Sequence, residues 1–176
     1  MSDLGKIGSS NMAGQNVNFI LTGLLILAFS FGLYRGTGHG KMVKLGSLLV
    51  LVVGLSTVGV GVFPDDSLCP SPSCNSVAAN GHVVAVFIIY PSIIVALLLF
   101  SRGLGSDTAW RRYRTYSLVT GIMAFAILAL DITLESTLMP WEGTIQRLFI
   151  GSWLVWIEFM AIRLFKLSGR SLTAHS

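Results

Sequence analysis

The chain has 176 residues, of which 53% are apolar and 11% charged, and its formal net charge is +4. Soluble domains contain about 25% charged residues, so a globule of this composition could not cover its surface with polar groups. The composition excludes a soluble nucleic-acid-binding domain in spite of the positive charge, and it excludes a disordered chain and a disulfide-rich secreted module. It predicts a multi-pass protein of the cell membrane.

Five stretches are apolar enough to cross a bilayer as helices, each of which needs about 20 residues. They cover residues 17–34, 45–63, 83–100, 117–139 and 145–165. The runs are too long and too uniformly apolar for barrel strands, whereas helices satisfy their own backbone hydrogen bonds in lipid. Since the loops between them are short, we expect one all-α transmembrane helical bundle over residues 1–176.

Lysine and arginine are distributed unevenly between the loops. Ten of the 12 fall on the side that holds the C-terminus, namely Arg35, Lys41, Lys44, Arg102, Arg111, Arg112, Arg114, Arg163, Lys166 and Arg170. Lys6 and Arg147 fall on the other side. Because cytoplasmic loops are enriched in these residues, we predict that the N-terminus lies outside and the C-terminus inside. The tryptophans are expected to mark the membrane interfaces: Trp110, Trp141, Trp153 and Trp156.

Polar and ionisable residues gather at the predicted outer ends of four consecutive spans. In chain order they are Asp65, Asp66, His82, Asp131, Glu135, Gln146 and Arg147. In lipid such groups are costly and normally find partners in the bundle interior. We therefore expect Arg147 to form an ion pair with Asp131 or Glu135, and His82 to hydrogen-bond Asp65 or Asp66.

This outer cluster has two interpretations. In the first, Pro64 stops a helix, the two acids after it are solvated, and a pair between Asp131 and Arg147 fixes two helices together. In the second, the cluster lines a polar pocket in which a carboxylate beside His82 would make a general base, a proton relay or half of a metal site. The sequence leaves both interpretations open.

Cys69 and Cys74 lie in a loop on the predicted outer side, in the segment Cys-Pro-Ser-Pro-Ser-Cys. Because that side is oxidising, the pair predicts a disulfide. A zinc site that adds His82 is the alternative, but it lacks the Cys-x2-Cys spacing and a fourth ligand. The sequence thus predicts a disulfide, no metal and no cofactor.

Three further patterns resemble one family. They are Ser2-Asp3-Leu4-Gly5 with Asn18-Phe19-Ile20 and Thr22-Gly23, Gly59-Val60-Gly61-Val62-Phe63-Pro64-Asp65-Asp66 with His82, and Gly143-Thr144-Ile145-Gln146-Arg147 with Trp153. Over nearly the whole chain they are similar to the domain-of-unknown-function 998 family of small prokaryotic membrane proteins. Only the insertion at 69–75 departs from the commoner, shorter loop. The resemblance implies a helical membrane fold, usually of six spans, so that one span before Ser2 is missing here. It implies no activity.

Three functions stay open at this point. Short loops and no catalytic signature favour a structural or accessory component of a membrane assembly, with lipids, other subunits or a second copy as partners and no nucleic acid. The outer cluster favours a small membrane enzyme or binding protein for a lipid or isoprenoid. A proton-coupled transporter has the least support, because no inverted repeat is visible. A pocket lined by the cluster would favour the second function.

Overall fold

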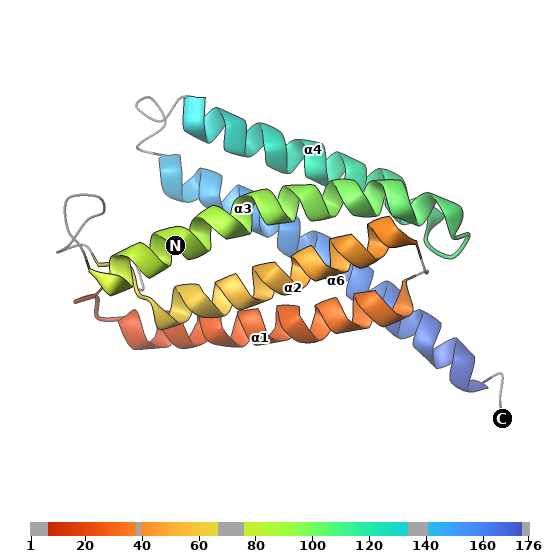
Figure 1. The fold of residues 1–176 in the computed structure, drawn as a ribbon, viewed down its shortest axis with the longest axis horizontal. Helices are drawn as coiled ribbons and strands as arrows, with labels where there is room; N and C mark the ends of the chain where they lie inside the picture. Colours follow the sequence, from red (N-terminus) through yellow and green to blue (C-terminus); the bar gives the residue numbers. More distant parts are fainter. Residues whose placement is uncertain (1–6, 38–39, 67–75, 134–140, 174–176) are drawn as a thin grey trace.

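The computed structural model is a bundle of five long helices (Figure 1) and describes residues 7–37, 40–66, 76–133 and 141–173. The helices are α1 (Met12–Gly36), α2 (Lys41–Val62), α3 (Val77–Gly103), α4 (Arg111–Thr133) and α6 (Glu142–Thr173), and a short 3-10 turn, η2 (Leu104–Ser106), follows α3. All five are long and apolar enough to cross a membrane. The predicted all-α membrane fold with five spans is confirmed.

Several helices extend beyond the apolar stretches from which they were predicted. Helix α3 begins at Val77 where residue 83 was expected, and α4 begins at Arg111 where 117 was expected. The start of α3 is capped, because the Ser76 hydroxyl accepts a hydrogen bond from the main-chain N–H of Ala79 at 3.4 Å. Such caps satisfy main-chain donors at a helix start, so a helix can continue through polar sequence outside the hydrocarbon.

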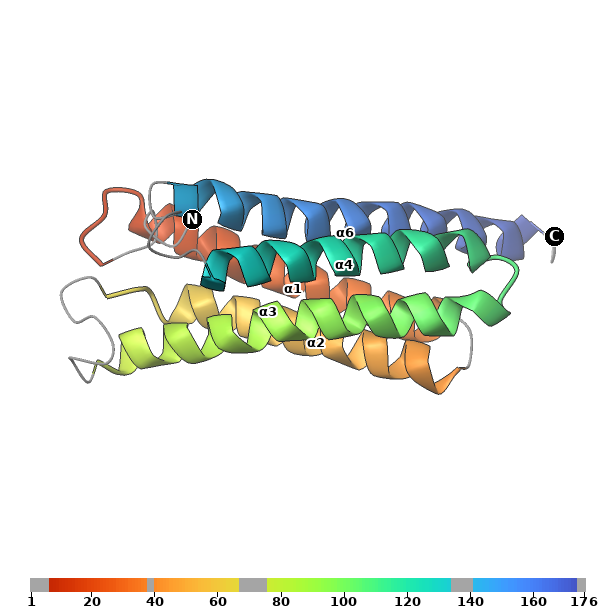
Figure 2. The ribbon, with the colours of Figure 1, turned by 90° about the horizontal axis from the view of Figure 1, so that it is seen from above.

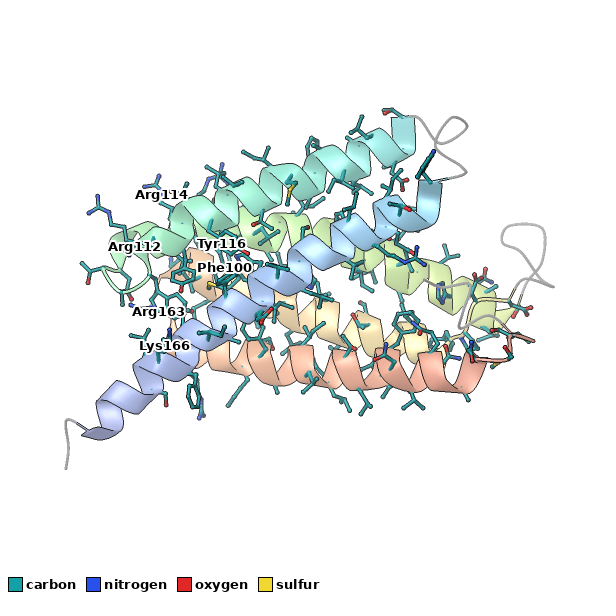
Figure 3. The ribbon with its side chains drawn as sticks, turned by 180° about the vertical axis from the view of Figure 1, so that it is seen from behind. Phe100, Arg112, Arg114, Tyr116, Arg163 and Lys166 are labelled. Carbon is teal, nitrogen blue, oxygen red and sulfur yellow. The ribbon has the colours of Figure 1, made fainter. Side chains whose placement is uncertain are left out.

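Successive helices run antiparallel, so helix starts and helix ends alternate at each end of the bundle (Figure 2). We call the end with the starts of α1, α3 and α6 the N-terminal end, and the opposite one the C-terminal end. Figure 3 shows that the C-terminal end gathers basic side chains, among them Arg112, Arg114, Arg163 and Lys166. This matches the charge separation read from the sequence. Which end faces the outside stays a prediction.

Helices α1 and α2 approach closely because glycines lie at their contact. A Cβ atom on Gly23 would lie 2.7 Å from the main-chain nitrogen of Val58 and 2.8 Å from the carbonyl oxygen of Gly54. A Cβ atom on Gly61 would lie 2.6 Å from the carbonyl oxygen of Asn16. Any larger residue would force the two backbones apart, and this close approach is how small residues stabilise helix pairs in membranes.

Helix α6 crosses the other helices obliquely. Toward the C-terminal end it lies on α1, where Leu164 packs against Gly32 and Gly36. At the N-terminal end its start lies near the end of α4 and apart from the start of α1 (Figure 1). Helices α1 and α6 therefore diverge toward the N-terminal end, and this divergence positions the cavity described below.

A cluster of buried aromatic side chains lies between the middle of the bundle and its C-terminal end. Phe29 and Phe100 contact the ring of Trp156, with centroids 6.3 Å and 5.2 Å away, and the Trp156 indole N–H donates to the Ser117 hydroxyl at 2.9 Å. Trp110, Trp153 and Trp156 are buried between the helices, whereas Trp141 is 62% exposed. Their positions relative to the membrane interfaces stay a prediction.

Candidate functional site

His82 lies in the second turn of α3 and is held by the chain that leaves α2. Its Nδ1 atom lies 3.0 Å from the main-chain oxygen of Phe63, the residue directly after α2. The Phe63 ring fits against α3 because residue 81 is glycine; a Cβ atom there would lie 2.6 Å from that ring. Pro64 then turns the chain away, since proline lacks the N–H that a further helical turn requires.

The structure corrects the expected partner of this histidine. Within the described residues, the carbonyl of Phe63 takes the place that we assigned to the carboxylate of Asp65 or Asp66. Both acids lie half-buried in the segment after α2, and both take part in other interactions. The main-chain oxygen of Asp65 accepts a hydrogen bond from the N–H of Ile7 at 2.9 Å. This hydrogen bond joins the segment after α2 to the chain just before α1.

Arg147 is not paired with Asp131, one of the two partners expected from the sequence. Its side chain is exposed on α6, and its guanidinium lies alongside Gly143, one turn earlier. Among the described side chains, no ion pair joins it to Asp131, which is half-buried on α4. A long arginine side chain near a helix end can extend along the surface to reach the polar interface, so burial in the bundle is not required. Glu135, the other expected partner, lies outside the described residues.

The predicted disulfide also falls outside the described residues. Cys69 and Cys74 both belong to the segment 67–75, of which nothing is described. The pairing of their thiols stays a prediction.

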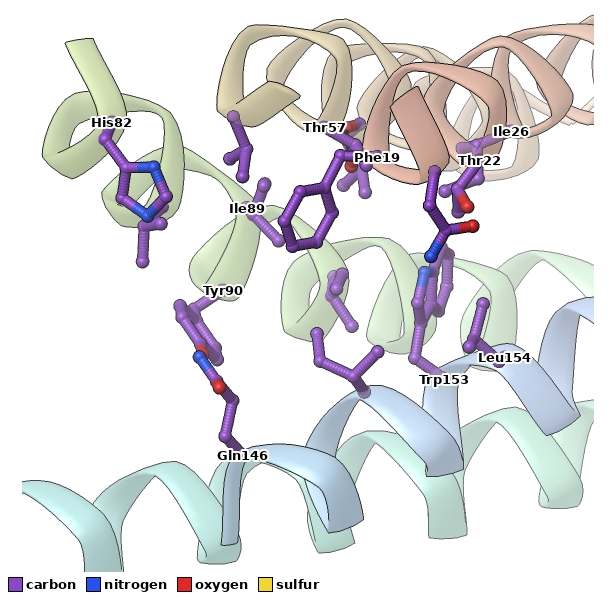
Figure 4. Close-up of a pocket in the computed structure, with 16 residues that line it drawn as sticks. Phe19, Thr22, Ile26, Thr57, His82, Ile89, Tyr90, Gln146, Trp153 and Leu154 are labelled. Carbon is purple, nitrogen blue, oxygen red and sulfur yellow. Dashed lines mark hydrogen bonds between the residues drawn. The ribbon is translucent and has the colours of Figure 1, made fainter. Parts of the chain in front are cut away.

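A cavity of about 170 Å³ lies between α1, α2, α3 and α6 in the half of the bundle toward the N-terminal end (Figure 4). Most of its wall is apolar, with Phe19, Ile26, Val53, Val60, Val86 and Ile89 among the lining residues. The polar lining residues are Asn18, Thr22, Thr57, His82, Tyr90 and Gln146. Within the described chain, the lining includes no lysine, arginine, aspartate or glutamate.

Three of these polar side chains form one end of the cavity. Figure 4 shows His82, Tyr90 and Gln146 on the same side of it. The Gln146 amide donates to the Tyr90 hydroxyl at 3.3 Å, and the Tyr90 ring packs on Phe149 with centroids 4.7 Å apart. Pro91 follows Tyr90, and a proline inside a helix removes one backbone hydrogen bond and bends the axis. The hydrogen bond between Gln146 and Tyr90 joins α3 to the first turns of α6.

Trp153 lines the cavity from α6. Its ring stacks on Trp156 with an interplanar angle of 11° and a centroid distance of 5.1 Å. The side chain is 2% exposed, and its indole N–H has no hydrogen-bond partner among the described residues. A buried donor without an acceptor costs about 1–3 kcal/mol. The cavity wall therefore contains a polar atom whose hydrogen-bonding capacity the described protein groups do not satisfy.

The cavity opens sideways between α1 and α6. Two of its lining residues are exposed on the bundle surface, Asn18 on α1 and Leu154 on α6, which is 42% exposed. These two helices diverge toward the N-terminal end, so the described part of the cavity lining reaches the surface between them. Leu154 is one of several exposed apolar side chains on α6, beside Leu148 and Val155.

Of the residues predicted from the sequence, the cavity brings together His82 and Gln146, and its described lining does not include Asp65, Asp66, Asp131 or Arg147. The sequence reasoning missed Asn18, Tyr90 and Trp153. Asn18 and Tyr90 are polar groups inside apolar runs, and this signal could have identified them, since such groups in a span normally face the bundle interior. Trp153 gave no usable signal, because tryptophan is also typical of interfaces.

Comparisons with known proteins identify a family and no activity. A family model described as "Protein of unknown function (DUF998)" matches residues 1–163. No curated protein matches the chain, and no solved structure does. The match confirms the resemblance read from the sequence.

Proposed function

We propose that this chain, which belongs to the DUF998 family of proteins of unknown function, binds an amphipathic lipid in the cavity between α1, α2, α3 and α6. The observation that carries the proposal is the arrangement of polar groups. His82, Tyr90 and Gln146 lie at one end, apolar side chains line most of the remainder, and the lining reaches the bundle surface at Asn18 and Leu154. Small-molecule sites are typically concave and apolar with a few placed polar groups.

The size of the cavity limits what it can hold. A cavity of about 150 Å³ accommodates a benzene-sized molecule, so 170 Å³ holds only part of a lipid. From His82 to Ile93 the lining of α3 extends about 16 Å at 1.5 Å per residue. A polar group at His82 with a single chain beside α3 fits these dimensions, and the rest of the chain leaves through the gap between α1 and α6.

The lining favours binding over catalysis. Within the described chain, the cavity lining includes no carboxylate that could orient His82 as a base for a nucleophile, an arrangement that covalent catalysis normally uses. The positive-inside distribution supports a site that receives its ligand from the outer leaflet of the cell membrane.

Filling the cavity tests this function. In Val86→Phe a lining residue of α3 becomes larger, whereas Val84→Phe makes the same change two residues away at a side chain that is 58% exposed. Both variants and the wild type are purified in mild detergent, and co-purifying lipid is measured by native mass spectrometry. We expect wild type and Val84→Phe to carry the same lipid, and Val86→Phe to lose most of it while its melting temperature stays equal or rises.

Two results would overturn the proposal. One is a wild type that carries no specific lipid, and the other is a Val86→Phe variant that retains it. If the wild type instead co-purifies in fixed ratio with another membrane protein and without lipid, the accessory-component function gains support in place of lipid binding.

A further inference from the structure

The geometry points to a chemical class for this ligand: an uncharged single-chain lipid whose hydroxyl group donates a hydrogen bond to Nε2 of His82. This inference rests on the proposed function, because it concerns the same cavity. Nε2 of His82 is the atom that recognises the ligand, and the ligand must supply a hydrogen-bond donor to it.

The contact with the main chain of Phe63 determines the tautomer of His82. The Nδ1 atom faces the main-chain oxygen of Phe63 at 3.0 Å, and a carbonyl oxygen can only accept. Nδ1 must therefore carry a proton. In the neutral ring the other nitrogen, Nε2, then has a lone pair and no proton. The backbone of the chain leaving α2 thus makes His82 an acceptor toward the cavity that it lines.

The residues that line the cavity limit the charge that a ligand can carry. Within the described chain, the cavity lining includes no lysine or arginine that would pair with an anion, and no aspartate or glutamate that would pair with a cation. Arg147 does not line the cavity, and its exposed guanidinium lies beside Gly143. Because an unpaired charge is costly to bury, the ligand's polar group is uncharged. A hydroxyl is the most compact uncharged donor that lipids carry.

The spacing of the lining residues on α3 indicates the path of the ligand's hydrocarbon chain. His82, Val86, Ile89 and Ile93 are spaced by four, three and four residues on α3 and all line the cavity. This spacing places them on one face of the helix. A ligand whose hydroxyl binds at His82 therefore lies along an apolar strip of α3, and its chain continues to the opening at Asn18 and Leu154. A fatty alcohol and a prenol share this chemistry.

The test compares probes that differ only at the head. 1-Dodecanol has a donor, methyl dodecyl ether has the same oxygen without its proton, and dodecanoate has a charge. Dissociation constants are measured on the full chain in nanodiscs. One net hydrogen bond corresponds to roughly a fivefold to tenfold difference in affinity, so we expect wild type to bind dodecanol tighter than the ether by about that factor.

Variants at position 82 connect this preference to the imidazole. His82→Phe removes the acceptor and should bind alcohol and ether equally. His82→Gln can place an amide oxygen near the position of Nε2 and should keep part of the preference for alcohol. Melting temperatures of both variants are recorded. If His82→Phe does not fold, His82→Gln and the comparison of probes on the wild type still test whether the ligand's hydroxyl donates to His82.

The possible results separate the two proposals. Equal binding of dodecanol and ether to wild type, with weaker binding to Val86→Phe, overturns the hydroxyl donor and leaves the cavity as the site. Tighter binding of dodecanoate than of dodecanol overturns the uncharged head. No binding of any probe, or equal binding to Val86→Phe, overturns the proposed function itself. Farnesol, a prenol of the same chain length, is measured beside dodecanol, and the tighter of the two identifies the kind of chain.

Discussion

The two halves of this bundle contain the same helices but differ in how completely side chains fill the space between them. From its middle toward the C-terminal end, α6 lies on α1 and α4, and Leu33, Val50, Leu97, Phe100, Trp156 and Met160 are fully buried between the helices. Toward the N-terminal end, α6 diverges from α1, and the space between them is a cavity with polar groups in its wall. The packed half holds the helices at the angle that keeps the other half open.

The difference lies in how completely side chains fill the space between the helices. Lipid chains are as apolar as leucine, so helices associate through close packing and through hydrogen bonds between them. Both halves provide such contacts: Trp156 donates to Ser117 in the packed half, and in the half with the cavity Gln146 donates to Tyr90. The half with the cavity also holds the indole N–H of Trp153, which has no acceptor among the described residues and therefore lowers stability.

The largest expected effect comes from opening the packed half. Trp156→Ala removes a fully buried ring and its hydrogen bond to Ser117, which should destabilise the bundle by about 3–5 kcal/mol. Trp141→Ala serves as the control, because that side chain is 62% exposed. Unfolding in detergent followed by circular dichroism measures both. Equal melting temperatures for the two variants would contradict the packed half as the source of stability.

A smaller effect is expected where α1 meets α2. In Gly23→Ala the new Cβ atom would collide with backbone atoms of Val58 and Gly54, so the helices must separate at a cost of about 1–3 kcal/mol. In Gly14→Ala the new atom meets nothing within 4 Å, and the higher helix propensity of alanine should stabilise α1 by up to about 1 kcal/mol. Thermal unfolding should shift in opposite directions. A shift of the same sign would mean that the close approach of α1 and α2 is not needed.

The next comparison uses one arginine from each end. The Arg163 guanidinium donates two hydrogen bonds to the carbonyl of Ala109, at 2.7 and 3.1 Å, which joins α6 to the turn before α4. Arg163→Met should cost about 1–2 kcal/mol. Arg147→Met should change stability by no more than about 0.5 kcal/mol, because its side chain is exposed. Chemical denaturation in micelles measures both. A larger loss for Arg147 would show that it pairs with an acid outside the described residues, such as Glu135.

The orientation of the two ends can be tested with no expected change in stability. Single cysteines replace Ser10 near the N-terminal end and Ser106 near the C-terminal end, both exposed, in a background without Cys69 and Cys74. A membrane-impermeant maleimide should label position 10 in intact cells and position 106 only after permeabilisation. The reverse pattern would place the cavity in the inner leaflet and would contradict the outer-leaflet part of the proposed function.

Much of the fold followed from local sequence. Apolar runs of sufficient length have to be helices in lipid, because a backbone without water must satisfy its hydrogen bonds within the segment. Positions of the spans and the grouping of basic residues at one end of the bundle could therefore be read directly. The helix starts were less certain, since Ser76 and similar caps allow a helix to continue into polar sequence.

The candidate site could be predicted only in part. His82 and Gln146 were identified because polar residues in a span normally face the interior. The expected carboxylate partner of His82 was replaced by the carbonyl of Phe63, and a main-chain acceptor leaves no trace in the side-chain sequence. Gly81 permits that contact by making room for the Phe63 ring, and the role of such a glycine becomes visible only once the two helices are placed.

What the sequence determined by itself is the membrane as solvent, the number of spans and the separation of charge, because each depends on residues close together in the chain. What only the tertiary structure decided is the crossing of α6, the cavity that this crossing leaves open, and the groups that share it. Those depend on how side chains from four helices fit together, since Leu164 packs against Gly32 and Gly36 at one end, whereas the described parts of α1 and α6 diverge at the other. A cavity is the space that packing leaves unfilled, so no single segment of the chain encodes it.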